Sequence, residues 1–232
     1  MANIVIKVFK GILDHYNEKL YNAYSKIESI KKLINQQVKI TNEIVLREAV
    51  NKGKGVILVT GHFGGIEFLP SVVAMKGYPI SIICRFQNQL FSKRIRERAE
   101  MVGIDIIETD RMNTIKAALQ ALKNGRILVT EVDELNKRKT GKNVDFLGYK
   151  INYDRTIDIL QRRSGSAVLF GLLKREPEKN YELILYNEIN TKESNVEITL
   201  GEKCLKLLET AIYSHPEQWY QWNKFGKIVS NN

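Results

Sequence analysis

The sequence predicts a three-layer α/β/α fold around a mostly parallel central sheet. From about residue 55 onward, short apolar runs alternate with helical patterns, and glycines mark the points where the helices end. Connections of this strand–helix–strand kind place helices on both faces of parallel strands. With 232 residues, 44% of them hydrophobic, the chain can bury a sizeable core in one domain, or in one domain with an extension.

The predicted elements follow from periodicity. The expected strands are Val56–Thr60, Ile80–Cys84, Ile104–Ile107, Ile127–Val132, Ala167–Leu173 and Glu182–Tyr186. The expected helices are Ile66–Lys76, Gln89–Val102, Met112–Lys123, Asp154–Ser164 and Gly201–Tyr213. Ligands of such sheets bind beyond the carboxyl ends of the strands, so the residues that directly follow the strands are candidates for a site.

Residues 1–50 are predicted to form an amphipathic helical extension in front of a domain that spans residues 51–232. Apolar residues recur there at spacings of three and four, with lysines between them. Helices packed on the domain are the favoured interpretation, and an interfacial helix lying on anionic lipid is the alternative. A signal-peptide core and an apolar run of ~18 residues are both missing, so we expect a soluble or peripheral protein, not a membrane-spanning one.

The charge balance favours anionic partners. Lys and Arg number 36 against 26 Asp and Glu, a net charge of +10. Nucleic acid, a phospholipid surface, and acidic or phosphorylated substrates all fit this charge. Nucleic acid ranks low, because the basic runs at 93–98 and 136–142 are dispersed and no zinc-finger, RNP or helix-turn-helix signature is present. For Cys84 and Cys204 we favour two reduced thiols over a disulfide, which suits the cytoplasm, and neither has metal-ligand spacing.

The segment Gly61–Glu67, GHFGGIE, directly follows the first strand of the alternating region. Gly64 and Gly65 allow a sharp turn and close approach of another molecule, and the amides at the helix start suit an anion or an oxyanion. After such a turn Glu67 can hold one imidazole nitrogen of His62, which leaves the other to act as a base. The alternative is a structural histidine, with Glu67 as an ordinary first-turn residue favoured by the helix dipole.

The same segment resembles the His-x4-Asp/Glu motif of glycerolipid acyltransferases, in the form found in the lipid A lauroyl/myristoyl acyltransferase family. That family reads Gly-His-Phe-Gly-Asn-Trp-Glu there, and its later motifs are similar, in order, to CRFQN, GRILVTEVDE, VDFLGYKINYDRTIDILQRRSGSAVLFGLL and SHPEQWYQWNKFGKI. The resemblance covers residues 51–227. Gly65-Ile66 replaces Asn-Trp, and 223–226 replaces a His-Arg-Arg-Trp region; these departures bear on the acceptor and not on the reaction.

The resemblance implies a glycerolipid-acyltransferase-like fold and O-acyl transfer to a hydroxyl of a lipid or glycolipid, as in lipid A and lipopolysaccharide biosynthesis. The donor would be a thioester of acyl carrier protein or coenzyme A, with no metal, no cofactor and no nucleic acid partner. His62 would be the general base and Glu67 its orienter. The protein would work as a peripheral enzyme on the cytoplasmic face of the bacterial inner membrane. A catalytically idle lipid-binding member is the rival, although retention of the His62–Glu67 pair argues against it.

Further site residues follow from the matched motifs. Arg85 and Arg98 are candidates for a phosphate of the head group or donor, because guanidinium suits phosphate oxygens; solvated charges are the alternative. Asp133 matches the strand-end aspartate of the family, which would order the site; a structural cap at the end of the strand is the alternative. Gly148 matches a Phe-Gly loop and is expected to form a backbone turn beside the cleft. The aromatic residues of the Pro216–Trp222 segment are expected to pack in the core, with an interfacial belt as the alternative.

Overall fold

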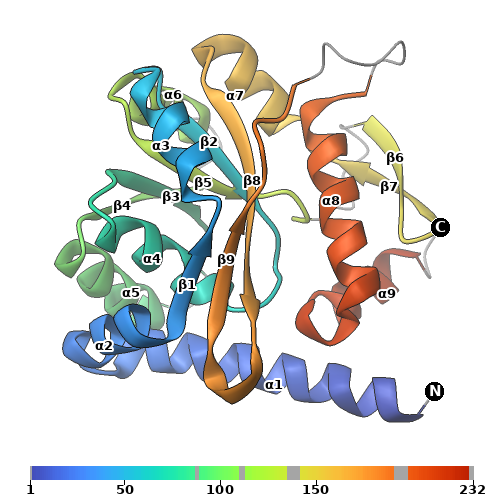
Figure 1. Ribbon diagram of the computed structural model, residues 1–232. Coiled ribbons are helices and arrows are strands. Elements are labelled where there is room, and N and C mark those ends of the chain that lie inside the picture. The colour runs from blue at the N-terminus through green and yellow to red at the C-terminus, as the bar shows by residue number, and fades with distance from the viewer. Residues whose placement is uncertain (1, 87–88, 110–112, 135–141, 191–197, 230–232) are drawn as a thin grey trace.

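The structure is a computed structural model that describes residues 2–86, 89–109, 113–134, 142–190 and 198–229, and it has the predicted three-layer α/β architecture (Figure 1). Its central 7-stranded sheet has the order β1-β9-β8-β2-β5-β3-β4. All neighbouring strands are parallel except β8 and β9. The strands are β1 (Val38–Thr41), β2 (Val56–Thr60), β3 (Ile80–Cys84), β4 (Ile104–Glu108), β5 (Ile127–Glu131), β8 (Ala167–Arg175) and β9 (Tyr181–Leu185).

Helices cover both faces of this sheet (Figure 1). One core lies between the sheet and α2 (Ile27–Gln37), α3 (Glu43–Asn51), α4 (Leu69–Met75) and α5 (Gln89–Met101). The other lies beneath α6 (Thr114–Lys123), α7 (Thr156–Ser164), α8 (Leu200–Ser214) and α9 (Trp222–Val229), and includes the antiparallel hairpin β6 (Lys142–Phe146) and β7 (Tyr149–Tyr153). Single 3-10 turns are η1 (Ile66–Phe68), η2 (Pro177–Lys179) and η3 (Pro216–Gln218).

Each strand expected from the alternating pattern is present to within about two residues. The pattern did not reveal β1, α3, α9 or the β6–β7 hairpin. Strand β1 has only four residues, two of them polar, and it lies at the edge of the sheet, where apolar periodicity is weak. Because β1 falls within residues 1–50 and pairs with β9, part of the predicted extension belongs to the central sheet. The division into domains at residue 50 stays a prediction.

Helix α1 (Ala2–Tyr24) packs with its polar side inward. Its buried positions are Gly11, His15, Glu18, Asn22 and Ala23, which recur at helical spacing. The Glu18 carboxylate accepts hydrogen bonds from Arg175 Nε at 2.6 Å and from Tyr181 Oη at 2.9 Å, which ties the helix to β8 and β9.

The apolar stripe of α1 faces outward instead. Its exposed members are Ile4, Val5, Ile6, Phe9, Leu13, Tyr16, Leu20 and Tyr24. Helix α1 does pack on the domain, as the favoured interpretation expects, but through its polar side, whereas α2 buries the apolar residues Ile30 and Ile34. None of the helices within the described residues is long and apolar enough to cross a membrane.

Candidate active site

A cleft of about 1320 Å³ opens beside the carboxyl ends of β3 and β5. Its walls come from these strands, from α1 and α5, from the segment that follows β2, and from the segment around Tyr220. One part is apolar and is lined by Ile82, Ile83, Ile95, Ala99, Ile104 and Val129. The polar part contains both His62 and Glu67, so the structure brings the predicted pair into one cleft.

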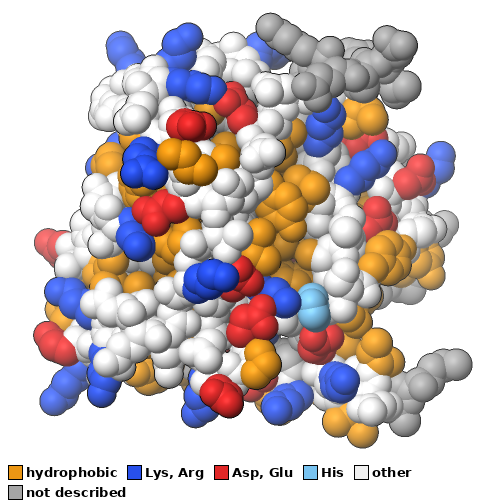
Figure 2. Space-filling view, viewed as in Figure 1, with side chains coloured by type: hydrophobic (Ala, Val, Ile, Leu, Met, Phe, Trp, Pro, Cys, Tyr) orange, Lys and Arg blue, Asp and Glu red, His pale blue; other side chains and the backbone are white. Residues whose placement is uncertain are grey.

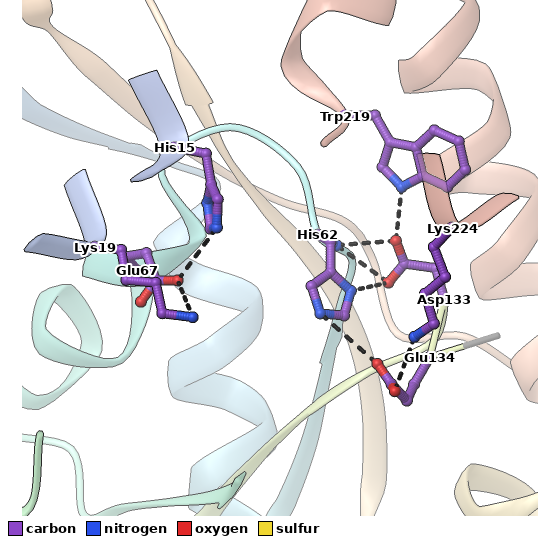
Figure 3. Close-up of polar contacts among 8 residues, drawn as sticks. All are labelled: His15, Lys19, His62, Glu67, Asp133, Glu134, Trp219 and Lys224. Carbon is purple, nitrogen blue, oxygen red and sulfur yellow. Dashed lines mark hydrogen bonds and ion pairs between the residues drawn. The ribbon is translucent and has the colours of Figure 1, made fainter. Parts of the chain in front are cut away.

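Parallel pairing of β2 with β5 positions the histidine. Thr60 is paired with Glu131, so His62 and Asp133 each lie two residues beyond a matched pair. Asp133 Oδ1 lies 2.8 Å from His62 Nδ1, and both carboxylate oxygens accept from the His62 backbone N–H at 3.1 Å (Figure 3). Asp133 is 0% exposed, so this carboxylate fixes both the backbone and the ring of His62.

A third element completes this arrangement. Trp219 Nε1 donates to Asp133 Oδ2 at 2.7 Å, and Trp219 is itself fully buried (Figure 3). The backbone on either side of Trp219 pairs with the histidine segment: Gly64 N–H donates to Gln218 O at 2.9 Å and Tyr220 N–H to His62 O at 3.3 Å. The expected core role of this segment is confirmed for Trp219. Its polar role was missed, because nothing in the sequence links the indole to Asp133.

The electrostatics of the pair favour a charged imidazole. Burial alone would lower the pKa of His62, but the Asp133 carboxylate, with Glu131 and Glu134 beyond it, outweighs burial and raises the pKa to about 9. Burial alone would raise the pKa of Asp133, but the charge and hydrogen bonds of His62, together with the Trp219 indole, hold it below its ordinary value. His62 Nε2 lies 3.9 Å from Glu134 Oε2, and the other oxygen of Glu134 accepts from Lys224 Nζ at 2.9 Å.

Glu67 does not hold the Nδ1 nitrogen of His62, so the predicted orienter is corrected to Asp133. The Glu67 carboxylate lies on η1, 3.7 Å from His15 Nε2 and 3.9 Å from Lys19 Nζ (Figure 3). Burial raises the pKa of Glu67, although the charges of Lys19 and His62 oppose the rise. His15 is neutral, because burial and the nearby Lys19 charge lower its pKa to about 3.

The glycines serve the fold and do not line the cleft. A Cβ on Gly64, whose φ is +59°, would lie 2.1 Å from Leu173 O, and one on Gly65 would lie 2.7 Å from the Tyr181 ring. The space expected for a substrate is therefore filled by β8 and β9. The Gly64 and Gly65 amides donate to Gln218 O and Leu173 O, which removes both from the expected anion site. Gly148 does form a turn, between β6 and β7, but away from the cleft lining.

The two predicted arginines differ in their surroundings. Arg85 is exposed at the cleft wall and makes no hydrogen bond or ion pair with the described residues. Arg98 is 8% exposed, and its guanidinium donates to the backbone carbonyls of Asn22, at 3.0 Å, and of Ser25. These contacts give Arg98 a structural role, the attachment of α1 to α5. Contact of either arginine with a phosphate stays a prediction.

The two cysteines are both free, as expected. Cys204 is buried and Cys84 lines the cleft. Burial raises the pKa of the Cys84 thiol to about 12, with Glu131 and Glu67 adding to the effect, so it is a poor nucleophile. No group of three or more His, Cys, Asp or Glu in the described part of the chain could hold a metal ion.

The comparisons with known proteins identify an acyltransferase. The model of the bacterial lipid A biosynthesis acyltransferase family matches residues 23–224, and the chain belongs to this family. It is accordingly an O-acyltransferase that transfers an acyl chain to a lipid. Among solved structures, 1-acyl-sn-glycerophosphate acyltransferase PlsC from Thermotoga maritima is similar, with 13% identity, a TM-score of 0.49 and coverage of 92% of each chain. No curated protein matches the chain.

Proposed function

We propose that His62 is the general base in transfer of an acyl chain from a thioester to a lipid hydroxyl. The observation that carries this proposal is the His62–Asp133 pair: Nδ1 is held 2.8 Å from a fully buried carboxylate, and the ring lines a cleft that has both an apolar and a polar part. Asp133 keeps the proton on Nδ1, which leaves Nε2 as the proton acceptor. Asp133 also stabilises the imidazolium that forms.

The reaction proceeds by direct attack. The acceptor hydroxyl gives its proton to His62 Nε2 as its oxygen adds to the thioester carbonyl carbon. The carbon–sulfur bond then breaks, and the thiolate takes the proton from the imidazolium. This route needs no covalent enzyme intermediate, metal or cofactor, and proton transfer of this kind contributes roughly 10²–10⁴-fold.

The charged residues of the cleft suit the expected substrates. The donor is the thioester of acyl carrier protein or coenzyme A, and Arg85 provides an exposed guanidinium, with no partner among the described residues, for a phosphate of that donor or of an anionic glycolipid. The apolar part of the cleft suits the acyl chain. Glu67 faces the same cleft, and we propose that it contacts the acceptor or shapes its binding, since Asp133 orients the base.

The test is transfer of labelled acyl chains from both thioesters into a bacterial lipid extract, with products identified by mass spectrometry. His62→Ala should abolish the new lipid product, Asp133→Asn should nearly abolish it, and Glu67→Gln should retain thioester hydrolysis while losing transfer. Asp145→Asn, at an exposed position of β6, is the matched control. Wild-type protein that binds lipid but neither transfers nor hydrolyses would overturn the proposal in favour of an idle lipid-binding member.

We propose further that α1 attaches the protein to an anionic membrane surface. The support is the outward apolar stripe, in which Phe9, Leu13 and Leu20 are 65%, 64% and 54% exposed. Leu20 also lines the cleft, so the stripe is continuous with its opening. Lysines interleave with this stripe in the sequence, as in helices that lie on anionic lipid. Figure 2 shows hydrophobic and basic side chains side by side along the lower edge, where α1 lies.

This arrangement would deliver a membrane lipid to the cleft from the side of α1, with thioester donors supplied from the cytoplasm. Sedimentation with vesicles of phosphatidylglycerol and phosphatidylcholine tests it. Phe9→Glu with Leu13→Glu should release the protein from vesicles while hydrolysis of a soluble thioester continues. Met101→Glu, at an exposed position of α5, should have no effect on binding. Equal binding of both variants would refute attachment through α1.

A further inference from the structure

Attack on a thioester places negative charge on the carbonyl oxygen, and enzymes stabilise that charge with hydrogen-bond donors fixed in advance. The start of η1 is the obvious source of such donors. However, the Gly64 and Gly65 amides already donate to Gln218 O and Leu173 O, at 2.9 Å and 2.7 Å. These two glycine amides are therefore not free to act as oxyanion donors beside His62, and a side chain of the cleft wall is another source.

Tyr220 is the donor-bearing side chain held most firmly beside His62. Its backbone N–H donates to His62 O, and its ring meets the imidazole edge to face at a centroid distance of 5.1 Å. On another side, the ring stacks on buried His15 at 3.4 Å, with an interplanar angle of 14°. The two imidazoles and the backbone bond fix the position of the phenol before any substrate arrives.

The Tyr220 hydroxyl is available. Tyr220 lines the cleft, and its side chain has no hydrogen bond to any residue that the structure describes. Burial, reinforced by the charges of Glu67 and Asp133, raises its pKa far above the ordinary value, so the hydroxyl keeps its proton. A neutral phenol can donate a hydrogen bond to an oxyanion, whereas the ionised carboxylates of the cleft can only accept hydrogen bonds.

We propose that the Tyr220 hydroxyl donates a hydrogen bond to the thioester oxygen in the transition state; this rests on the function proposed above. As the acceptor oxygen bonds to the carbonyl carbon, the π electrons of the carbonyl move onto its oxygen, which Tyr220 stabilises without giving up its proton. The electrons return as the carbon–sulfur bond breaks, and His62 returns the acceptor's proton to the thiolate. The products are the ester and the free thiol.

The experiment compares Tyr220→Phe with wild type in two reactions of an acyl-coenzyme A: transfer to a lipid acceptor in the extract, and hydrolysis by water. Phenylalanine retains the ring between the two histidines and removes only the hydroxyl. Because both reactions pass through the same oxyanion, kcat should fall by roughly 10²–10³-fold in both, with donor affinity unchanged. Tyr213→Phe, at a position 68% exposed on α8, is the matched control.

If the Tyr220 hydroxyl had a purely structural role, Tyr220→Phe would also change the melting temperature and the pH dependence that His62 imposes. Our proposal predicts that both stay unchanged in this variant. A loss confined to transfer would place the hydroxyl on the acceptor and overturn the inference. A fall in kcat of less than about threefold in both reactions would also overturn the inference, because removal of one oxyanion donor is expected to cost roughly 10²–10³-fold. If wild type and His62→Ala were equally inactive, the proposed function would fail and this inference with it. If activity depends on His62 but not on Tyr220, only this inference fails.

Discussion

Replacing Asp133 by asparagine should reduce activity to an extent that depends on pH. In wild type the pKa of His62 is about 9, so only about 1% of the imidazole is neutral and able to act as a base at pH 7. Without the carboxylate, the buried ring should titrate at its ordinary pKa or below, and most of it is neutral at pH 7. The asparagine amide, however, can donate to Nδ1, which moves the proton to Nε2 and blocks the base. An equivalent change in serine proteases costs roughly 10⁴-fold.

These two effects oppose each other at pH 7 and not above pH 9. The loss in kcat/KM should therefore be roughly 10⁴-fold at high pH and roughly 10²-fold at pH 7, where the larger neutral fraction offsets part of it. A discontinuous assay measures the product formed from an acyl-coenzyme A between pH 6 and pH 10, with correction for spontaneous hydrolysis. Two results would refute the assignment of Asp133 as the residue that sets the basicity of His62. One is a rise in wild-type kcat/KM centred near pH 6.5, and the other is a loss of kcat/KM in Asp133→Asn that is equal at pH 7 and above pH 9.

Three further predictions concern stability. Trp219→Phe removes the indole donor from buried Asp133 Oδ2 and leaves only the longer bond from the His62 backbone N–H, so the free energy of unfolding, measured by urea denaturation, should fall by about 1.5–3 kcal/mol, the range for a hydrogen bond to a charged group. Gly64→Ala should be far more destabilising than Gly148→Ala: both have positive φ, but only at Gly64 would the new Cβ collide with the β8 backbone, and equal melting temperatures would contradict this. The raised pKa of His62 means that its pairing stabilises the fold fully below pH 6.5 and ceases to do so as pH rises through about 9. The stability difference between wild type and His62→Gln should shrink across that interval.

Much of the fold was predictable because a buried parallel strand can be recognised from a short apolar run in the sequence. The run VILVT is buried at every position of β2, and a wholly apolar strand of this kind needs no knowledge of its neighbours to be found. The parts that were missed depend on tertiary contacts. Strand β1 is stabilised by its pairing with β9, about 140 residues later in the chain, and its four residues have too little periodicity of their own.

The orientation of α1 shows a second limit of local patterns. An apolar stripe indicates that a helix is amphipathic, but it does not say which side meets the protein. Here Glu18 is directed inward by a bidentate contact with Arg175 and a hydrogen bond from Tyr181. Arg175 lies 157 positions from Glu18 in the sequence, so the apolar periodicity of α1 alone does not reveal which side of the helix packs on the domain.

The sequence places His62 at a strand end, as the structure does, but it does not identify Asp133 as the carboxylate that contacts the imidazole, for a reason that lies in strand order. The spacing of Glu67 from His62 suggested a local contact, yet a 3-10 turn directs Glu67 toward α1 and its Lys19. Asp133 is 71 residues from His62, and only the pairing of β2 with β5 places the two at the same level. A sequence read one strand at a time identifies both strand ends but does not reveal that they are neighbours. Since parallel sheets gather their functional groups from several strand ends, an orienting residue is better sought after another strand than along the same loop.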